Sequence, residues 1–407
     1  MALFGAALLA GAAVKVLLYT DLTIRRDQLF WHRDLGLLTK AYRTLGHDAW
    51  LVVHPAKLRP PESKVRSEAG PSPATRDDPV IWAAPCDVRH PGWWQSHKPD
   101  LVILGLWTRP QYDSIRRAAL SATPRIIERA DSDGMRTASC GLLTYVKRRF
   151  DYFRDRTCRW PAILSIPVSA LYSFASILAT PWMEARLART LKLIPALAVE
   201  TPAATQLWRE LAAKLGADPK RIHCVPHPIQ TDIFRLDPKL PKKKQVISVG
   251  RWESYQKNLP LLLKFLIPFL HQKTDWSALV VGSGLPASPP HPRITFSPPL
   301  PAPRLSRRMQ ESRIFLSSSR YESFGLAAAE AALSGCRVVA LGDCLPGWPR
   351  APSMGSHDGP MSNLMAAAEN GPRPRSPAGK LSLAPNRVAV LFLRIAGTLK
   401  KRAPRLT

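Results

Sequence analysis

Two carboxylates with seven residues between them, Glu322 and Glu330, form the most chemically suggestive pattern in the sequence. The apolar run 313–318 predicts a strand before them, and the alanine-rich run 326–333 predicts a helix that ends near Gly335. This order places Glu322 in a loop and Glu330 inside the helix. The backbone N–H groups at the start of such a helix would point at an anion, and a glycine there allows the backbone to approach it closely. The residues that would line this loop and helix start are Ser323, Phe324, Gly325 and Leu326.

A second cluster follows the apolar run 246–249, where Gly250 and Arg251 are succeeded by Lys257. Arginine offers a planar fork of donors to phosphate oxygens, and lysine offers a mobile point charge. A reaction in which phosphate departs as the leaving group requires positive charge where the negative charge develops. These residue types therefore indicate a ligand that carries phosphate.

Together, the two clusters resemble the retaining glycosyltransferases of the GT-B fold, the large family 4 with its Glu-x7-Glu signature. The resemblance implies that Arg251 and Lys257 hold the diphosphate of a nucleotide-sugar donor. It also implies that Glu330 accepts hydrogen bonds from the ribose, while Glu322 meets the transferred sugar near its anomeric centre. The expected reaction retains the anomeric configuration by front-face attack, with neither carboxylate acting as a nucleophile. Glu322, Arg251 and Lys257 are the expected catalytic residues, and Gly250, Ser323, Phe324, Gly325, Leu326 and Glu330 the expected donor-binding ones.

No cofactor or metal is expected, because no Asp-x-Asp signature precedes these motifs and the two cations would take the place of Mg²⁺. The string Asp131-Ser132-Asp133 has the spacing of a metal site, but it follows a predicted strand of the N-terminal half. We therefore favour the interpretation that these aspartates do not bind a metal.

Two series of alternating strand and helix patterns predict an α/β chain of GT-B type, with two Rossmann-like βαβ domains facing a cleft. The Pro- and Lys-rich stretch 235–244 reads as the linker between them. The predicted domains are 14–234, which would bind the acceptor, 245–380, which would bind the donor, and 381–407, a C-terminal helix and basic tail.

Acceptor contacts cannot be read from the N-terminal half. Segment 222–234 resembles the family's motif at the end of that domain, except that His227-Pro228 replaces Asn-Gly. Arg25 and Asp131 are candidates for the acceptor side of the cleft, and a structural salt bridge is the alternative for each.

The formal net charge of +28 over 407 residues predicts anionic partners. No zinc-finger, homeodomain or RNP-type pattern accompanies the charge, so no nucleic-acid partner is expected. Six cysteines without a Cys-x-x-Cys pair favour reduced thiols and a cytoplasmic location. Residues 1–13 are apolar without a basic region before them, and we interpret them as an extension rather than a signal peptide.

The stretch Trp160 to Met183 contains no charged residue and is flanked by basic ones. A helix buried against the N-terminal domain is the preferred interpretation, ahead of a helix at a membrane surface and a transmembrane span. With the net charge, this stretch predicts docking to the anionic inner face of a membrane.

The predicted function is therefore that of a hexosyltransferase of polysaccharide biosynthesis. It would move a sugar from a nucleotide-diphosphate sugar to a glycan or lipid-linked acceptor. Two alternatives remain: a nucleotide-sugar epimerase-like enzyme of the same fold, and a non-catalytic protein that binds nucleotide sugars.

Overall fold

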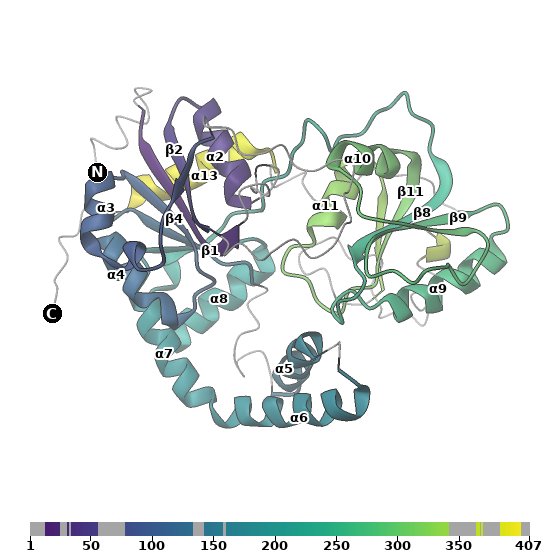
Figure 1. Ribbon diagram of the computed structural model, residues 1–407, viewed down its shortest axis with the longest axis horizontal. Helices are drawn as coiled ribbons and strands as arrows, with labels where there is room; N and C mark the ends of the chain where they lie inside the picture. The colour runs from purple at the N-terminus through teal and green to yellow at the C-terminus, as the bar shows by residue number, and fades with distance from the viewer. Residues whose placement is uncertain are drawn as a thin grey trace. The chain divides into compact units, whose positions relative to one another are not determined.

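The computed structural model describes residues 13–24, 31, 34–55, 78–132, 142–157, 160–341, 364–366, 368 and 383–399. These residues group into two compact units (Figure 1). Unit 1 takes its residues from Met1–Ser132, Trp182–Gln230 and Ser382–Thr407, and unit 2 from Asp133–Pro181 and Thr231–Leu381. Each unit is an α/β layer structure with its own parallel sheet, as the two predicted βα series require.

Unit 1 is built on a seven-stranded sheet of order β3-β2-β1-β4-β5-β6-β7, in which every pair of neighbours is parallel. The apolar run predicted at 14–19 becomes the central strand, and its residues from Val16 to Tyr19 are fully or almost fully buried. The strands are β1 (Lys15–Ile24), β2 (Asp48–Pro55), β3 (Val80–Trp82), β4 (Leu101–Gly105), β5 (Ile126–Arg129), β6 (Ala196–Val199) and β7 (Ile222–Cys224).

Helices cover both faces of this sheet (Figure 1). They are α2 (Asp34–Thr44), α3 (Pro91–His97), α4 (Asp113–Leu120), α7 (Thr180–Leu193), α8 (Pro202–Lys214) and α13 (Pro385–Thr398). Helix α8 begins at a side-chain cap, because the Thr201 hydroxyl accepts a hydrogen bond from the Ala204 N–H.

The C-terminal helix α13 departs from the predicted division of the chain, which set residues 381–407 apart as a helix and basic tail. Val388, Ala389, Phe392, Leu393 and Ala396 lie on one face of α13 at helical spacing and are buried in the core of unit 1. The Tyr42 hydroxyl of α2 donates a hydrogen bond to the Ala389 carbonyl at 3.2 Å. This burial makes α13 an integral part of the first unit.

Unit 2 contains a five-stranded parallel sheet of order β10-β9-β8-β11-β12. Its strands are β8 (Lys243–Arg251), β9 (Ser277–Ser283), β10 (Ile294–Ser297), β11 (Ser312–Ser317) and β12 (Arg337–Ala340). Its helices are α9 (Leu259–Gln272), α10 (Ala302–Glu311) and α11 (Leu326–Leu333), together with α5 (Leu142–Arg156) and α6 (Ala162–Leu178). The predicted ranges assigned α5 and α6 to the first domain, whereas they belong to the second compact unit.

The basic run 242–244 at the end of the predicted linker has a structural role. The Lys242 ammonium donates to the carbonyls of Met309, Ser312 and Ser334 at 3.2, 2.9 and 2.9 Å. The Met309 and Ser312 carbonyls stand at the C-terminal end of α10 and the Ser334 carbonyl at that of α11, where a cation is favoured by the helix dipole. Burial lowers the pKa of Lys242.

The helix predicted within 160–183 forms, but the preferred interpretation of it as a buried helix is wrong. In α6 the large apolar side chains face solvent, including Ile163, Leu171 and Phe174. Among the described residues no single helix is both long and apolar enough to cross a membrane. One pair bent by 64°, Ile163–Leu178 with Thr180–Leu193, passes that test by length and composition alone.

Candidate active site

The predicted site residues of unit 2 lie at the carboxyl edge of its sheet. Strand β8 ends at Arg251 and β11 ends at Ser317, and the two strands are hydrogen-bonded neighbours. The loops that follow them therefore meet at one edge, which is where ligands bind in open parallel sheets. The Ser318 hydroxyl donates to the Lys257 carbonyl at 2.8 Å, and the Gln256 amide donates to the Tyr321 carbonyl at 2.8 Å.

Lys257 and Glu322, one from each loop, form an ion pair between Nζ and Oε1. The Ser319 hydroxyl donates to the same carboxylate oxygen at 2.7 Å. The Lys257 and Glu322 side chains are only 19% and 13% exposed. The structure thus brings together a cation and a carboxylate that are 65 residues apart in the chain and that were predicted to share a site.

Two glycines pack closely at the end of β8, one against Lys257 and the other against the first glycine. A Cβ at Gly250 would lie 3.3 Å from Cγ of Lys257, so the missing side chain leaves room for the lysine. At Gly282, φ is +146° and a Cβ would fall 1.7 Å from the Gly250 carbonyl oxygen, so no other residue fits there without a shift of the backbone.

The remaining predicted residues follow Glu322 along the chain. Phe324 is buried, and Gly325 caps the start of α11 with a φ of +80°, which a glycine adopts without strain. Leu326 begins the helix, and Glu330 lies half-buried in its second turn. Arg251 stands exposed at the end of β8. The predicted placement of one glutamate in a loop and the other in a helix is confirmed.

Helix α5 contacts both loops of the site, and no pattern in the sequence indicated these contacts. Asp155 accepts hydrogen bonds from the Ser254 hydroxyl at 2.6 Å and from the Gln256 N–H at 3.0 Å. The Arg148 guanidinium lies over the ring of Tyr321, 4.9 Å from its centre. Burial, together with the carboxylates of α5, raises the pKa of the Tyr321 hydroxyl well above its usual range. Helix α5 therefore holds the loops that present Lys257 and Glu322.

Unit 1 carries a second cluster of ionisable groups at the carboxyl edge of its own sheet. His227 Nε2 lies 2.7 Å from Glu200 Oε1, its Nδ1 lies 3.1 Å from Asp34 Oδ1, and Arg129 contacts the same Nδ1. Burial and Arg129 lower the pKa of His227, but the charge of Glu200 and the hydrogen bonds to Asp34 and Glu200 outweigh them and raise it to about 9. Burial raises the pKa of Glu200, and His227 opposes that shift.

Asp131 joins this cluster, since it, Glu200 and His227 each offer a ligand atom within 4.8 Å of the others. The guanidinium of Arg129 in contact with His227 disfavours a divalent cation, because it already supplies positive charge there. His227, Glu200, Asp34 and Arg129 thus form an ion-pair network, and Asp131, whose side chain is exposed, lies next to it. Asp133 and Arg25 lie outside the described residues.

Comparison with known proteins agrees with this architecture. Residues 243–369 match the family model described as "Glycosyl transferases group 1". No curated protein matches the sequence. The structure is similar to HepE of Anabaena in complex with UDP-glucose, at a TM-score of 0.50 and 13% identity, with 95% of this chain and 98% of HepE covered.

Two further solved structures are similar at lower TM-scores. The lipopolysaccharide outer core galactosyltransferase WaaB has a TM-score of 0.49 at 12% identity, with 94% of this chain and 98% of WaaB covered. Sucrose-phosphate synthase from Thermosynechococcus elongatus has a TM-score of 0.47 at 12% identity, with 95% and 94% covered. The predicted fold class is confirmed: the chain has the GT-B fold with two Rossmann-like domains, and its second domain matches glycosyl transferases group 1, which supports a GT-B glycosyltransferase.

Proposed function

We propose that the protein transfers a hexose from a nucleotide-diphosphate sugar to a glycan or lipid-linked acceptor, with retention of the anomeric configuration. The observation that carries the proposal is the Lys257–Glu322 pair, held at the carboxyl edge of the sheet, where β8 ends at Arg251. The match of residues 243–369 to glycosyl transferases group 1 supports the same conclusion.

The ion pair suggests how the donor would be received. In the structure the Lys257 ammonium is neutralised by Glu322. A diphosphate offers the ammonium more negative charge, so Lys257 would turn to the phosphate oxygens with Arg251 beside it. Glu322 would then be free to accept hydrogen bonds from hydroxyls of the transferred sugar.

The start of α11 would complete the donor site. Its first N–H groups have no partner within the helix, and the helix dipole favours an anion there. Glu330, one turn further on, would accept hydrogen bonds from the ribose. In this proposal the leaving phosphate helps to deprotonate the acceptor. Arg251, Lys257 and the helix start stabilise the leaving group without a metal ion.

The charge of the chain bears on the setting of the reaction. A role in polysaccharide biosynthesis at the inner, cytoplasmic face of a membrane fits the net charge of +28, since anionic lipid attracts such a surface. UDP-glucose, the ligand in the HepE structure, is the first donor to try.

A screen of UDP-, GDP- and ADP-sugars, with and without EDTA, tests the proposal. We expect release of the nucleoside diphosphate from at least one donor, and its persistence in EDTA. Epimerised donor without release would favour the epimerase-like alternative. Tight nucleotide binding without turnover would favour a non-catalytic binding protein.

A further inference from the structure

Helix α6 is amphipathic, but its polar face is buried and its apolar face is exposed to solvent. This is the reverse of a surface helix in a water-soluble protein. Its described buried residues are all serines, at positions 165, 169, 173 and 176. Its exposed side chains are apolar, with Ile163 at 80%, Leu171 at 67% and Phe174 at 60% exposure. A helix in water normally turns its apolar stripe inward. An apolar exterior around a seam of small residues is the arrangement of helices that pack in lipid.

The hydroxyls of the buried serines are satisfied within the helix pair. The Ser169 and Ser173 hydroxyls donate to the carbonyls four residues earlier, at 2.6 and 2.7 Å. Arg149 of α5 donates to the Ser176 hydroxyl at 3.0 Å, and Arg154 donates to that of Ser165. The serine hydroxyls of the seam therefore need no water, and α6 presents its hydrocarbon outward.

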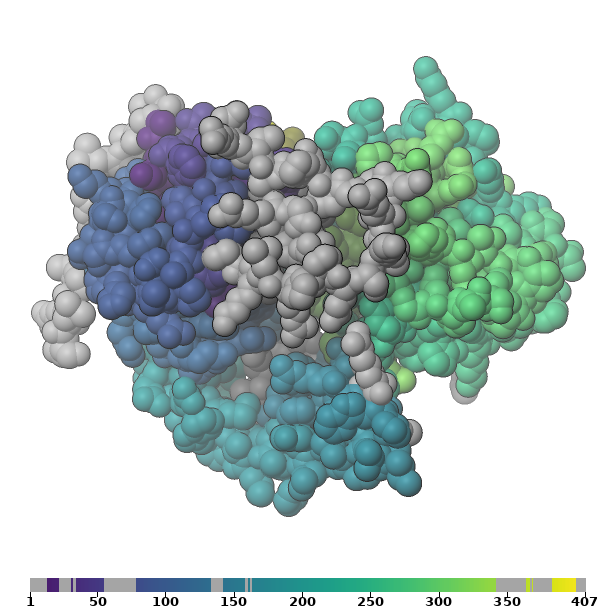
Figure 2. Space-filling model, in the orientation of Figure 1, coloured from purple at the N-terminus to yellow at the C-terminus, as the bar shows by residue number. Residues whose placement is uncertain are grey.

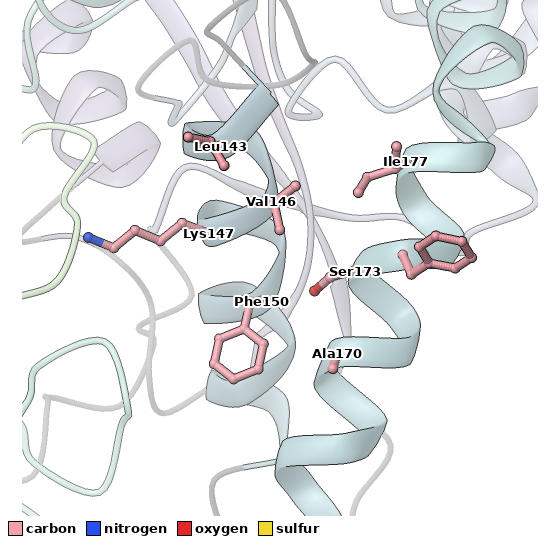
Figure 3. A pocket seen from close by; sticks show the side chains of 8 residues that line it. Leu143, Val146, Lys147, Phe150, Ala170, Ser173 and Ile177 are labelled. Carbon is pink, nitrogen blue, oxygen red and sulfur yellow. The ribbon is translucent and has the colours of Figure 1, made fainter.

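A groove of about 370 Å³ runs between α5 and α6 (Figure 3). Leu143, Val146 and Phe150 line it from α5, and Ala170, Phe174 and Ile177 line it from α6. Leu143 is 85% exposed, so the apolar surface continues from the groove onto α5. Atoms of this part of the chain, blue-green in Figure 2, stand uncovered on the face shown. Contiguous exposed apolar side chains mark interaction surfaces.

The charges on the helix pair decide between possible occupants. Lys147 and Arg156 are exposed, and the Lys147 side chain extends away from α6 (Figure 3). The two acidic side chains of α5 are turned inward, since Asp151 is buried and Asp155 is hydrogen-bonded to Ser254. The fully exposed ionic groups on the described part of the pair are thus basic. Hydrocarbon rimmed by positive charge is complementary to an anionic lipid surface.

Aromatic residues reinforce this choice. Trp160, 53% exposed, precedes α6, and Tyr172, 52% exposed, lies within it. Tryptophan and tyrosine are enriched where hydrocarbon meets lipid headgroups. Both residues are therefore placed on the surface that would meet a bilayer.

We infer that α5 and α6 form a membrane-docking hairpin, in which α6 lies in the headgroup–acyl boundary of an anionic bilayer and the groove takes up hydrocarbon. The inference does not depend on the transfer reaction. Asp155 and Arg148 attach α5 to the loops that carry Lys257 and Glu322. The docked hairpin would therefore hold the proposed donor site next to the lipid surface.

Flotation with vesicles tests the inference. Full-length protein is mixed with phosphatidylcholine vesicles, with or without 30 mol% phosphatidylglycerol (about one anionic lipid in three), over a salt series. We expect flotation with the anionic vesicles at low salt and a loss of binding as salt screens the charges. The pair Leu171→Ser with Phe174→Ser should weaken binding at least tenfold, because both side chains are exposed and apolar.

The matched control is Leu45→Ser with Leu236→Ser, two leucines exposed elsewhere, which should float like the parent. Quenching of tryptophan fluorescence by brominated lipid should fall in Trp160→Phe. Failure of the parent to float, or flotation of the Leu171/Phe174 variant at the parent level, would overturn the inference. So would self-association that the same variant abolishes without any vesicle binding, because the face would then join two copies of the chain.

Discussion

Replacing Lys257 by alanine should weaken the binding of a nucleoside diphosphate. A charge-assisted hydrogen bond to phosphate contributes about 1.5–3 kcal/mol. When the parent binds a nucleotide, Lys257 must first leave its ion pair with Glu322. This cost cancels up to about 1 kcal/mol of what the phosphate contact contributes. The net effect is about 0.5–3 kcal/mol, or roughly two- to 150-fold in Kd.

The measurement is calorimetric titration of UDP, GDP and ADP into parent and variant. Lys264→Ala is the matched control, since Lys264 is an exposed lysine of α9 outside the site, and it should bind like the parent. Glu322→Gln should leave affinity unchanged or improve it, because it removes the competitor for the ammonium. Equal Kd values for Lys257→Ala and the parent, for every nucleotide that the parent binds, would refute this reasoning.

Three further predictions concern stability, each measured by denaturant unfolding. Gly282→Ala should destabilise unit 2 by about 1–3 kcal/mol, because its Cβ would collide with the Gly250 carbonyl; an unchanged midpoint would contradict this. The pKa of His227 is about 9 in the folded state, above its usual value, so the stability that it contributes is complete below pH 6.5 and is lost as the pH rises through 9. The unfolding free energy of the parent should therefore fall between pH 6.5 and 9.5 by about 1–3 kcal/mol more than that of His227→Gln. Parallel pH profiles would argue against the buried pair with Glu200. Lys242→Met should cost about 2–4 kcal/mol, because three carbonyls lose their donor, and a neutral effect would show that water replaces the ammonium.

The strands and most helices of both sheets could be predicted because buried parallel strands are continuous apolar runs separated by helical patterns. Lys257 and Glu322 could be placed together for the same reason, since each follows a strand at the same edge of one sheet. The role of Gly282 could not be predicted from the sequence, because its close approach to Gly250 depends on the pairing of β8 with β9.

The interpretation of α6 failed because composition does not tell which face of a helix is buried. The serines at 165, 169, 173 and 176, spaced four, four and three residues apart, were the signal that marks its inner face. The attachment of α5 to the site loops rests on contacts about 100 residues apart in the chain, such as Asp155 to Ser254, and no local pattern encodes them. The burial of α13 in the first unit has the same long-range origin.

The most direct test of the central claim is turnover of nucleotide sugars by the parent and by Glu322→Gln, measured together in EDTA. The account predicts that the parent releases nucleoside diphosphate from at least one donor without added metal. It also predicts that Glu322→Gln still binds that donor but releases nucleotide at least tenfold more slowly. Equal release by the two proteins, or release that disappears in EDTA, would contradict the assignment of Lys257, Arg251 and Glu322 to a metal-independent transfer site.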